Sequence, residues 1–161
     1  MPDAGGAVGA ARHSDYSASF GGTSIHGGVK NESRMPWTSL LVIGIGAIVG
    51  AWARWGLGVL LNPTFPTLPL GTLAANLAGA FIIGVMMALT GPLNISPATR
   101  LLVTTGFLGA LTTFSTFSAE TMTLLLRAQY AWAVGAAAAH LGGSLFMTGA
   151  GILLVRTVLG K

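Results

Sequence analysis

Four long apolar stretches limit what this chain can fold into. They run from Leu40 to Leu61, Leu70 to Leu89, Leu101 to Leu126 and Ala131 to Val155. A helix needs about 20 mostly apolar residues to cross the hydrocarbon core of a bilayer. Prolines, which end helices, gather in the first two connections: Pro63, Pro66, Pro69, Pro92 and Pro97. The pattern predicts an all-α membrane protein with four transmembrane helices.

The charge content argues against a water-soluble globular domain and against a nucleic-acid-binding protein. Only 7% of the residues are charged, whereas soluble domains carry about 25%. The net charge of +4 comes from scattered basic residues, which do not form a nucleic-acid-binding patch. Cysteine is absent, so disulfides and cysteine-based metal sites are excluded.

Residues 1–36 differ from the rest of the chain. They are rich in Gly, Ser and Ala and too polar to fold alone. They contain no continuous apolar core of the kind a secretory signal peptide has. We therefore expect a disordered N-terminal tail over residues 1–36 and a four-span domain over residues 37–161.

The basic residues predict the orientation of the chain. With four spans, most of them fall on the side of the N-terminus, and one falls on the other side. The first group is Lys30, Arg34, Arg100, Arg156 and Lys161, and the single residue is Arg127. Because loops rich in Lys and Arg stay in the cytoplasm, we expect both termini there, in a multi-pass protein of the cell membrane.

Two polar residues inside the first two stretches each allow two interpretations. Arg54 can extend its charged end to the membrane interface, or it can be buried and bonded to carbonyl oxygens or to Glu120. Asn76 can hold two helices together by hydrogen bonds, or its amide can donate hydrogen bonds into an anion path.

The fourth stretch carries a polar stripe. His140, Ser144 and Thr148 are spaced i, i+4 and i+8 and therefore share one helix face. A hydroxyl can be satisfied by the carbonyl four residues earlier, which would explain Ser144 and Thr148 singly. Three polar residues on one face instead indicate a track along a water or ion path.

The third stretch contains the segment TTGFLGALTTFSTFS, residues 104–118. Its glycines and β-branched threonines favour a break in the helix at membrane depth. Such a break persists only where it is buried or lines a cavity, and it leaves carbonyls free for a cation and N–H groups free for an anion. Phe114 and Phe117 share a face, either for packing or to present positive ring edges to an anion.

These motifs resemble the CrcB/Fluc fluoride channels. The resemblance lies in GAIVGAWARW, PLGTLAANLAGAFIIG and GFLGALTTFSTFSAE, and it extends over about residues 37–160. It implies four-helix subunits with a broken third helix, which pair antiparallel into dimers with two narrow fluoride pores. The second subunit would be another copy or a homologous chain.

The resemblance also implies roles for particular residues. Gly109 and Thr112, with their symmetry mates, would hold a structural Na⁺ ion through main-chain carbonyls; this ion is not transported. Arg54 and Glu120 match charged positions of the pattern. His140 occupies a position where we expect Tyr or another hydroxyl. The fluoride path would comprise Asn76, Phe114, Phe117, Ser115, Thr116, His140, Ser144 and Thr148.

The function that follows is passive export of fluoride from the cytoplasm, which reduces fluoride toxicity. Fluoride holds its water tightly, so a path must replace that water with donors that do not trap the ion. No nucleotide site or catalytic constellation is evident, which argues against an enzyme. One alternative is a small four-span proton-coupled exporter, which needs a carboxylate inside the membrane; only Glu120 could serve. Another is a structural membrane subunit without transport.

Overall fold

The computed structural model describes residues 36–90 and 94–160, and the predicted tail therefore lies, apart from Pro36, outside the described residues. The described part is helical, without strands. Its elements are α1 (Trp37–Leu61), η1 (Asn62–Thr64), α2 (Leu70–Leu89), α3 (Pro97–Arg100), η2 (Leu101–Leu108), α4 (Gly109–Leu111), α5 (Phe114–Leu126) and α6 (Tyr130–Leu159).

The prediction of four membrane-crossing segments is confirmed. Within the described residues, four segments are long and apolar enough to cross a bilayer: Trp37–Thr64, Leu70–Leu89, Pro97–Leu126 and Tyr130–Leu159. The second has the predicted bounds, whereas the others are longer than the apolar stretches. The helices continue past the apolar residues because helical hydrogen bonding does not require apolar side chains.

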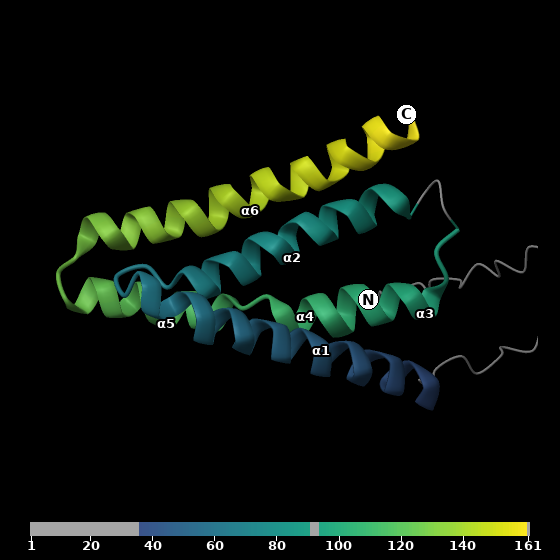
Figure 1. Cartoon of the computed structure of the whole chain (residues 1–161), viewed down its shortest axis with the longest axis horizontal. Coiled ribbons are helices and arrows are strands. Elements are labelled where there is room, and N and C mark those ends of the chain that lie inside the picture. Colours follow the sequence, from purple (N-terminus) through teal and green to yellow (C-terminus); the bar gives the residue numbers. More distant parts are fainter. Residues whose placement is uncertain (1–35, 91–93, 161) are drawn as a thin grey trace, which may run out of the picture. The chain divides into compact units, whose positions relative to one another are not determined.

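Local signals set the ends of the third segment. Ser96 precedes Pro97 at the start of α3, and the Ser96 hydroxyl accepts a hydrogen bond from the Thr99 N–H at 3.1 Å. This is an ordinary N-terminal cap followed by a proline at the first helical position. Between α5 and α6 the chain turns tightly, and Ala128 takes a left-handed φ of 56°. The turn returns α6 alongside α2 (Figure 1).

The helices pack through glycines. α2 packs mainly against α6, and α1 packs mainly against η2. At Gly50 of α1, an added Cβ would overlap the main-chain oxygen of Phe107. At Gly84 of α2, it would overlap the main-chain oxygen of Thr148. The absence of side chains therefore lets these helix backbones approach closely, as is common inside membranes.

The outer surface is strongly apolar. Large side chains such as Trp52, Trp55 and Phe146 are at least 70% exposed. The buried core is small and made of residues such as Ala75, Leu108 and Leu111. A water-soluble protein rarely exposes contiguous apolar surface on this scale, so the outer face fits contact with lipid.

Replacing Gly50 with alanine should destabilise the protein, because the main chain of Phe107 cannot move aside as a flexible side chain can. The expected loss is about 1–3 kcal/mol, seen as a lower midpoint of thermal unfolding in detergent. Gly44→Ala, in the same helix, is the control, since a Cβ at Gly44 would meet no atom within 4 Å. Equal midpoints for the two variants would contradict the close packing of α1 on η2.

Candidate functional site

The third segment changes conformation near its middle. η2 is π-helical over its eight residues, and after α4 the chain is extended at Thr112 (φ −80°, ψ 150°) and Thr113 (φ −148°, ψ 112°). Figure 1 shows this thin link between α4 and α5. The π-helical turns are not predicted from the sequence. Single-turn π-bulges inside α-helices are frequent at functional sites, and here α4 separates the π-helical residues from the extended pair.

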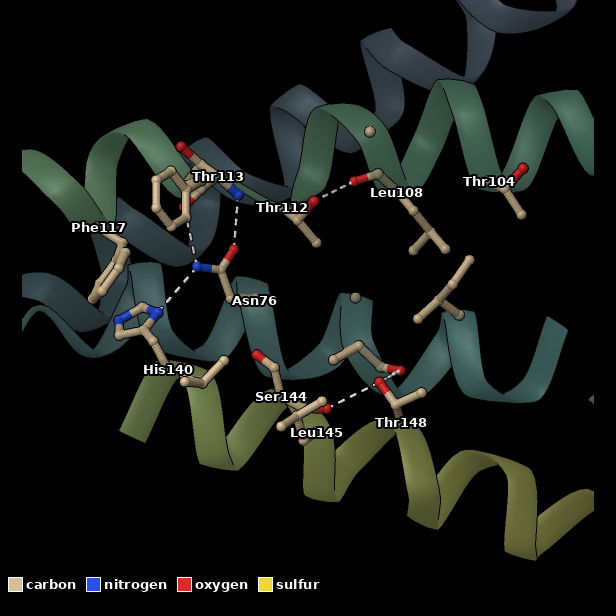
Figure 2. Close-up of a pocket in the computed structure, with 16 residues that line it drawn as sticks. Asn76, Thr104, Leu108, Thr112, Thr113, Phe117, His140, Ser144, Leu145 and Thr148 are labelled. Carbon is tan, nitrogen blue, oxygen red and sulfur yellow. Dashed lines mark hydrogen bonds between the residues drawn. The ribbon is translucent and has the colours of Figure 1, made fainter. Parts of the chain in front are cut away.

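Asn76 of α2 hydrogen bonds to the main chain of Thr113. The Thr113 N–H donates to Asn76 Oδ1 at 2.7 Å, and Asn76 Nδ2 donates to the Thr113 carbonyl at 3.1 Å (Figure 2). In an extended residue the N–H and C=O point to the same side, as they do in paired β-strands. One side-chain amide can therefore satisfy both groups, and α2 supplies the bonds that helical backbone would otherwise make.

Thr113 also starts the next helix. Its hydroxyl accepts a hydrogen bond from the Thr116 N–H at 3.2 Å, which caps α5. The side chain is buried. All three polar groups of this one residue are thus bonded within the protein, which fixes the geometry of the link at a depth where water is scarce.

His140 of α6 joins this network. Its Nδ1 lies 3.1 Å from Asn76 Nδ2, and the side chain is buried, with 6% of its surface exposed. The imidazole lies against the ring of Phe117, with centroids 4.6 Å apart and planes tilted by 34°. Phe117 in turn meets Phe114 edge-on at 5.6 Å. The predicted phenylalanine pair and the first member of the polar stripe are therefore in one cluster.

A cavity of about 530 Å³ opens beside this cluster. None of the described residues that line it is Lys, Arg, Asp or Glu. Six of the eight residues predicted for the fluoride path line it, together with the two predicted to hold a cation: Asn76, Phe114, Phe117, His140, Ser144, Thr148, Gly109 and Thr112. Residues from three separate predicted segments are thus brought together in one space.

Most hydroxyls of this cavity are already engaged. Thr112 donates to the Leu108 carbonyl at 2.9 Å, and Thr104 donates to the Arg100 carbonyl at 2.6 Å. Thr148 shares its proton between the carbonyls of Ser144 and Ala80, at 2.9 and 3.1 Å. The bonds to carbonyls four residues earlier are the ones expected for single helical hydroxyls, and the bond to Ala80 also links α6 to α2.

The remaining predicted residues lie elsewhere. Arg54 and Thr116 line a second cavity of about 450 Å³, and Thr113 lines both cavities. Ser115 lines neither of the two. The partner of Glu120 is Thr72, whose hydroxyl donates to Glu120 Oε1 at 2.6 Å.

The extended pair leaves main-chain oxygens free. In a continuous helix the Thr113 N–H would bond to the Gly109 carbonyl, but here it is taken by Asn76. Likewise the Thr116 N–H, the helical partner of the Thr112 carbonyl, is taken by the Thr113 hydroxyl. Within residues 94–160, no bond across the link ends on either carbonyl oxygen. Oxygen atoms of this kind suit a hard cation such as Na⁺.

Two hydrogen-bonded residues, Thr113 and Thr72, are not among the site residues predicted from the sequence. The GT pair at residues 71–72 was a usable signal for Thr72, because a hydroxyl one turn before Asn76 lies on the same helix face. No sequence signal distinguishes Thr113 from Thr112.

Comparison with known proteins decides the family. The family model described as CrcB-like protein, Camphor Resistance (CrcB), matches residues 41–152, a range that contains every residue of the first cavity. The chain belongs to the CrcB family. As a CrcB-family chain with four helices able to cross a bilayer, it is a multi-pass membrane protein.

Several relatives carry the same name, fluoride-specific ion channel FluC. The one from Pseudomonas putida (strain W619) is 52% identical over 124 residues, which cover 76% of this chain and 98% of that protein. The one from Nitrosospira multiformis is 57% identical over 119 residues, covering 73% and 93%. The one from Chromobacterium violaceum is 57% identical over 117 residues, covering 72% and 93%. This CrcB-family chain therefore matches these proteins over almost their whole length.

Replacing Asn76 with alanine should loosen the link, because the Thr113 N–H and C=O both lose their partner. A buried polar group left unsatisfied costs about 1–3 kcal/mol. We expect a lower unfolding midpoint and faster hydrogen exchange at the Thr113 amide. Ser144→Ala, in the same cavity, is the control, because no described bond uses its hydroxyl. Equal exchange at Thr113 in the two variants would refute this role of Asn76.

Proposed function

We propose that this chain forms a fluoride-selective channel that lets fluoride leave the cytoplasm passively. The observation that carries the proposal is the uncharged cavity in which Asn76, Phe117, His140 and Ser144 meet beside an interrupted helix. The relatives at 50–57% identity are named fluoride-specific ion channels, and this supports the same ion here.

The cavity chemistry suits fluoride. An anion that leaves its water shell needs replacement donors, but a fixed cation in the path would hold it too tightly. The lining offers the side chains of Ser144 and His140 and the rings of Phe114 and Phe117, whose edges carry positive potential. These groups can each stabilise a small anion for a short time without trapping it.

The arrangement favours passive flow over proton coupling. A proton-coupled exporter needs a titratable carboxylate on the transport path. Among residues 36–90 and 94–160, no carboxylate lines the first cavity, and Glu120, which does not line it, accepts a hydrogen bond from Thr72. A membrane potential that is negative inside then drives the anion outward. Hydrogen fluoride enters as a neutral weak acid and releases fluoride inside, so passive export reduces toxicity.

A second subunit would complete the path. Phe114 lines the cavity although 79% of its surface is exposed. Leu141 and Leu145 on the same cavity are 69% and 67% exposed. One wall of the cavity is thus unfinished within a single chain. An antiparallel partner, either another copy or a homologous chain, would cover this side and form the dimer that the family resemblance implies.

The free carbonyl oxygens at the link fit a structural Na⁺ ion. Gly109 and Thr112 would supply two oxygens from each subunit, so a symmetric pair would supply four. When bound, the ion would offset the converging negative ends of these carbonyls. The ion would stabilise the assembled dimer and would not itself be transported.

Fluoride flux tests the function directly. Proteoliposomes loaded with fluoride, with equal pH on both sides and a voltage imposed by a potassium gradient, should release fluoride rapidly to a fluoride-selective electrode. Release that requires a pH gradient would point to the proton-coupled exporter. An absence of release under every condition would point to a structural subunit.

Phe117→Ile should lower that flux by about tenfold or more, since the aliphatic side chain has no positive edge. Phe146→Ile is the matched control: Phe146 lies on α6 but is 74% exposed and lines neither cavity. Cells that depend on this protein should lose fluoride tolerance with the first variant only. Equal flux through both variants would remove Phe117 from the path.

Replacing all Na⁺ with a large organic cation should reduce both the dimer fraction in detergent and the fluoride flux, and added Na⁺ should restore both. The reason is that the carbonyls of Gly109 and Thr112 would face one another without a counter-charge. Release of fluoride from protein-free vesicles by an ionophore provides the control for effects on the electrode or lipid. A dimer fraction and a flux that are both independent of Na⁺ would exclude the structural ion.

A further inference from the structure

The orientation of the Asn76 side chain is determined by main-chain groups. The Thr113 N–H can only donate, so the atom 2.7 Å from it must be the amide oxygen. The Thr113 carbonyl can only accept, so the atom 3.1 Å from it must be the amide nitrogen. These two bonds allow only one assignment of the oxygen and nitrogen of Asn76.

This orientation determines the tautomer of His140. Asn76 Nδ2 uses one hydrogen on Thr113 and directs the other at His140 Nδ1, 3.1 Å away. Nδ1 must therefore accept. A neutral imidazole has one acceptor and one donor nitrogen, so the proton of His140 lies on Nε2.

The same bonds leave few free donors in the cavity. Both hydrogens of the Asn76 amide are used. The hydroxyls of Thr112 and Thr148 donate to carbonyl oxygens. Among the described lining residues, the donors that an anion can meet without breaking a described bond are the Ser144 hydroxyl and the His140 Nε2–H, one helical turn apart on α6.

The Nε2 atom is accessible. Within the described residues, Thr121 Oγ1 is the only fully buried side-chain polar atom without a hydrogen-bond partner. Nε2 has no described partner, so it is not sealed from space that water can occupy. Figure 2 shows the second ring nitrogen on the side away from Asn76, next to Phe117. The stacked Phe117 ring restrains the imidazole plane.

We propose that His140 divides its two nitrogens between two tasks: Nδ1 positions Asn76, and the Nε2–H contacts fluoride beside Phe117. The proposal rests on the fluoride function proposed above. An N–H group at this position is a donor only, whereas the hydroxyl expected there from the family pattern both donates and accepts. A donor-only group offers an anion stabilisation and gives a cation no ligand.

The tautomer can be measured without any transport. We would label histidine with ¹⁵N in the full chain, carrying His13→Gln and His26→Gln so that His140 alone gives signals, and record solid-state NMR in liposomes at mildly alkaline pH. The expected result is a protonated Nε2 and an unprotonated Nδ1. In an Asn76→Ala background the preference should weaken. A protonated Nδ1 in the chain with intact Asn76 would overturn the proposal.

Two substitutions separate the two tasks. His140→Gln places an amide near the position of Nε2 and keeps a donor there. His140→Asn places an amide near Nδ1 and keeps an acceptor for Asn76 but no donor at Nε2. If Nε2–H contacts fluoride, the flux through His140→Asn should fall about tenfold below that of His140→Gln, the effect of one lost hydrogen bond.

The outcomes are distinguishable. If the unsubstituted protein conducts fluoride but the two variants conduct equally, or the order is reversed, the Nε2 contact is wrong and the proposed function stands. If the unsubstituted protein conducts no fluoride, the proposed function fails and the Nε2 contact fails with it, whereas the NMR result still decides the tautomer. Size-exclusion profiles of both variants must match that of the unsubstituted protein. If the profile of either variant does not match, the NMR measurement becomes the deciding test.

Discussion

The pair of hydrogen bonds between Asn76 and Thr113 is the interaction on which the site depends. Unpaired main-chain groups cost several kcal/mol each in hydrocarbon, so a link between helices at this depth cannot persist alone. One amide on a neighbouring helix satisfies both groups of the extended residue. It thereby frees the Gly109 carbonyl, positions the start of α5, and directs its remaining hydrogen at His140.

This amide acts only because α2 is held closely between its neighbours. The missing side chain at Gly84 lets α2 contact the backbone of α6 at Thr148, and the Thr148 hydroxyl bonds across to Ala80. At the other end, Asn62 caps α2 by accepting from the Gly71 N–H at 2.8 Å. Close helix contacts and a few interhelical hydrogen bonds therefore hold the helices together, whereas in soluble proteins the burial of large side chains does so.

The sequence predicted more of the site than of its internal bonding. The stripe of His140, Ser144 and Thr148 and the pair of Phe114 and Phe117 were predicted from helical spacing, and the structure places them around one cavity. For Asn76 the sequence allows two interpretations, a bond between helices or a donor in an anion path. In the structure the Asn76 amide bonds to the main chain of Thr113 and faces His140 Nδ1, and these contacts join α2 to the third segment and to α6. Thr116 and Arg54 line a different cavity. Helical spacing predicts which residues share a helix face, but it does not predict which other helix or cavity that face contacts.

The sequence by itself determined the four membrane-crossing segments, because apolar length is a local property that bilayer thickness converts directly into a span. It also determined which polar residues lie at membrane depth and share a face. Only the tertiary structure decided which of two adjacent threonines is bonded by Asn76, which hydroxyls are already engaged, and which ring nitrogen of His140 faces Asn76. Those outcomes depend on the distance and direction between groups on different helices, and residues 37 or 64 positions apart are brought within hydrogen-bonding distance only by packing.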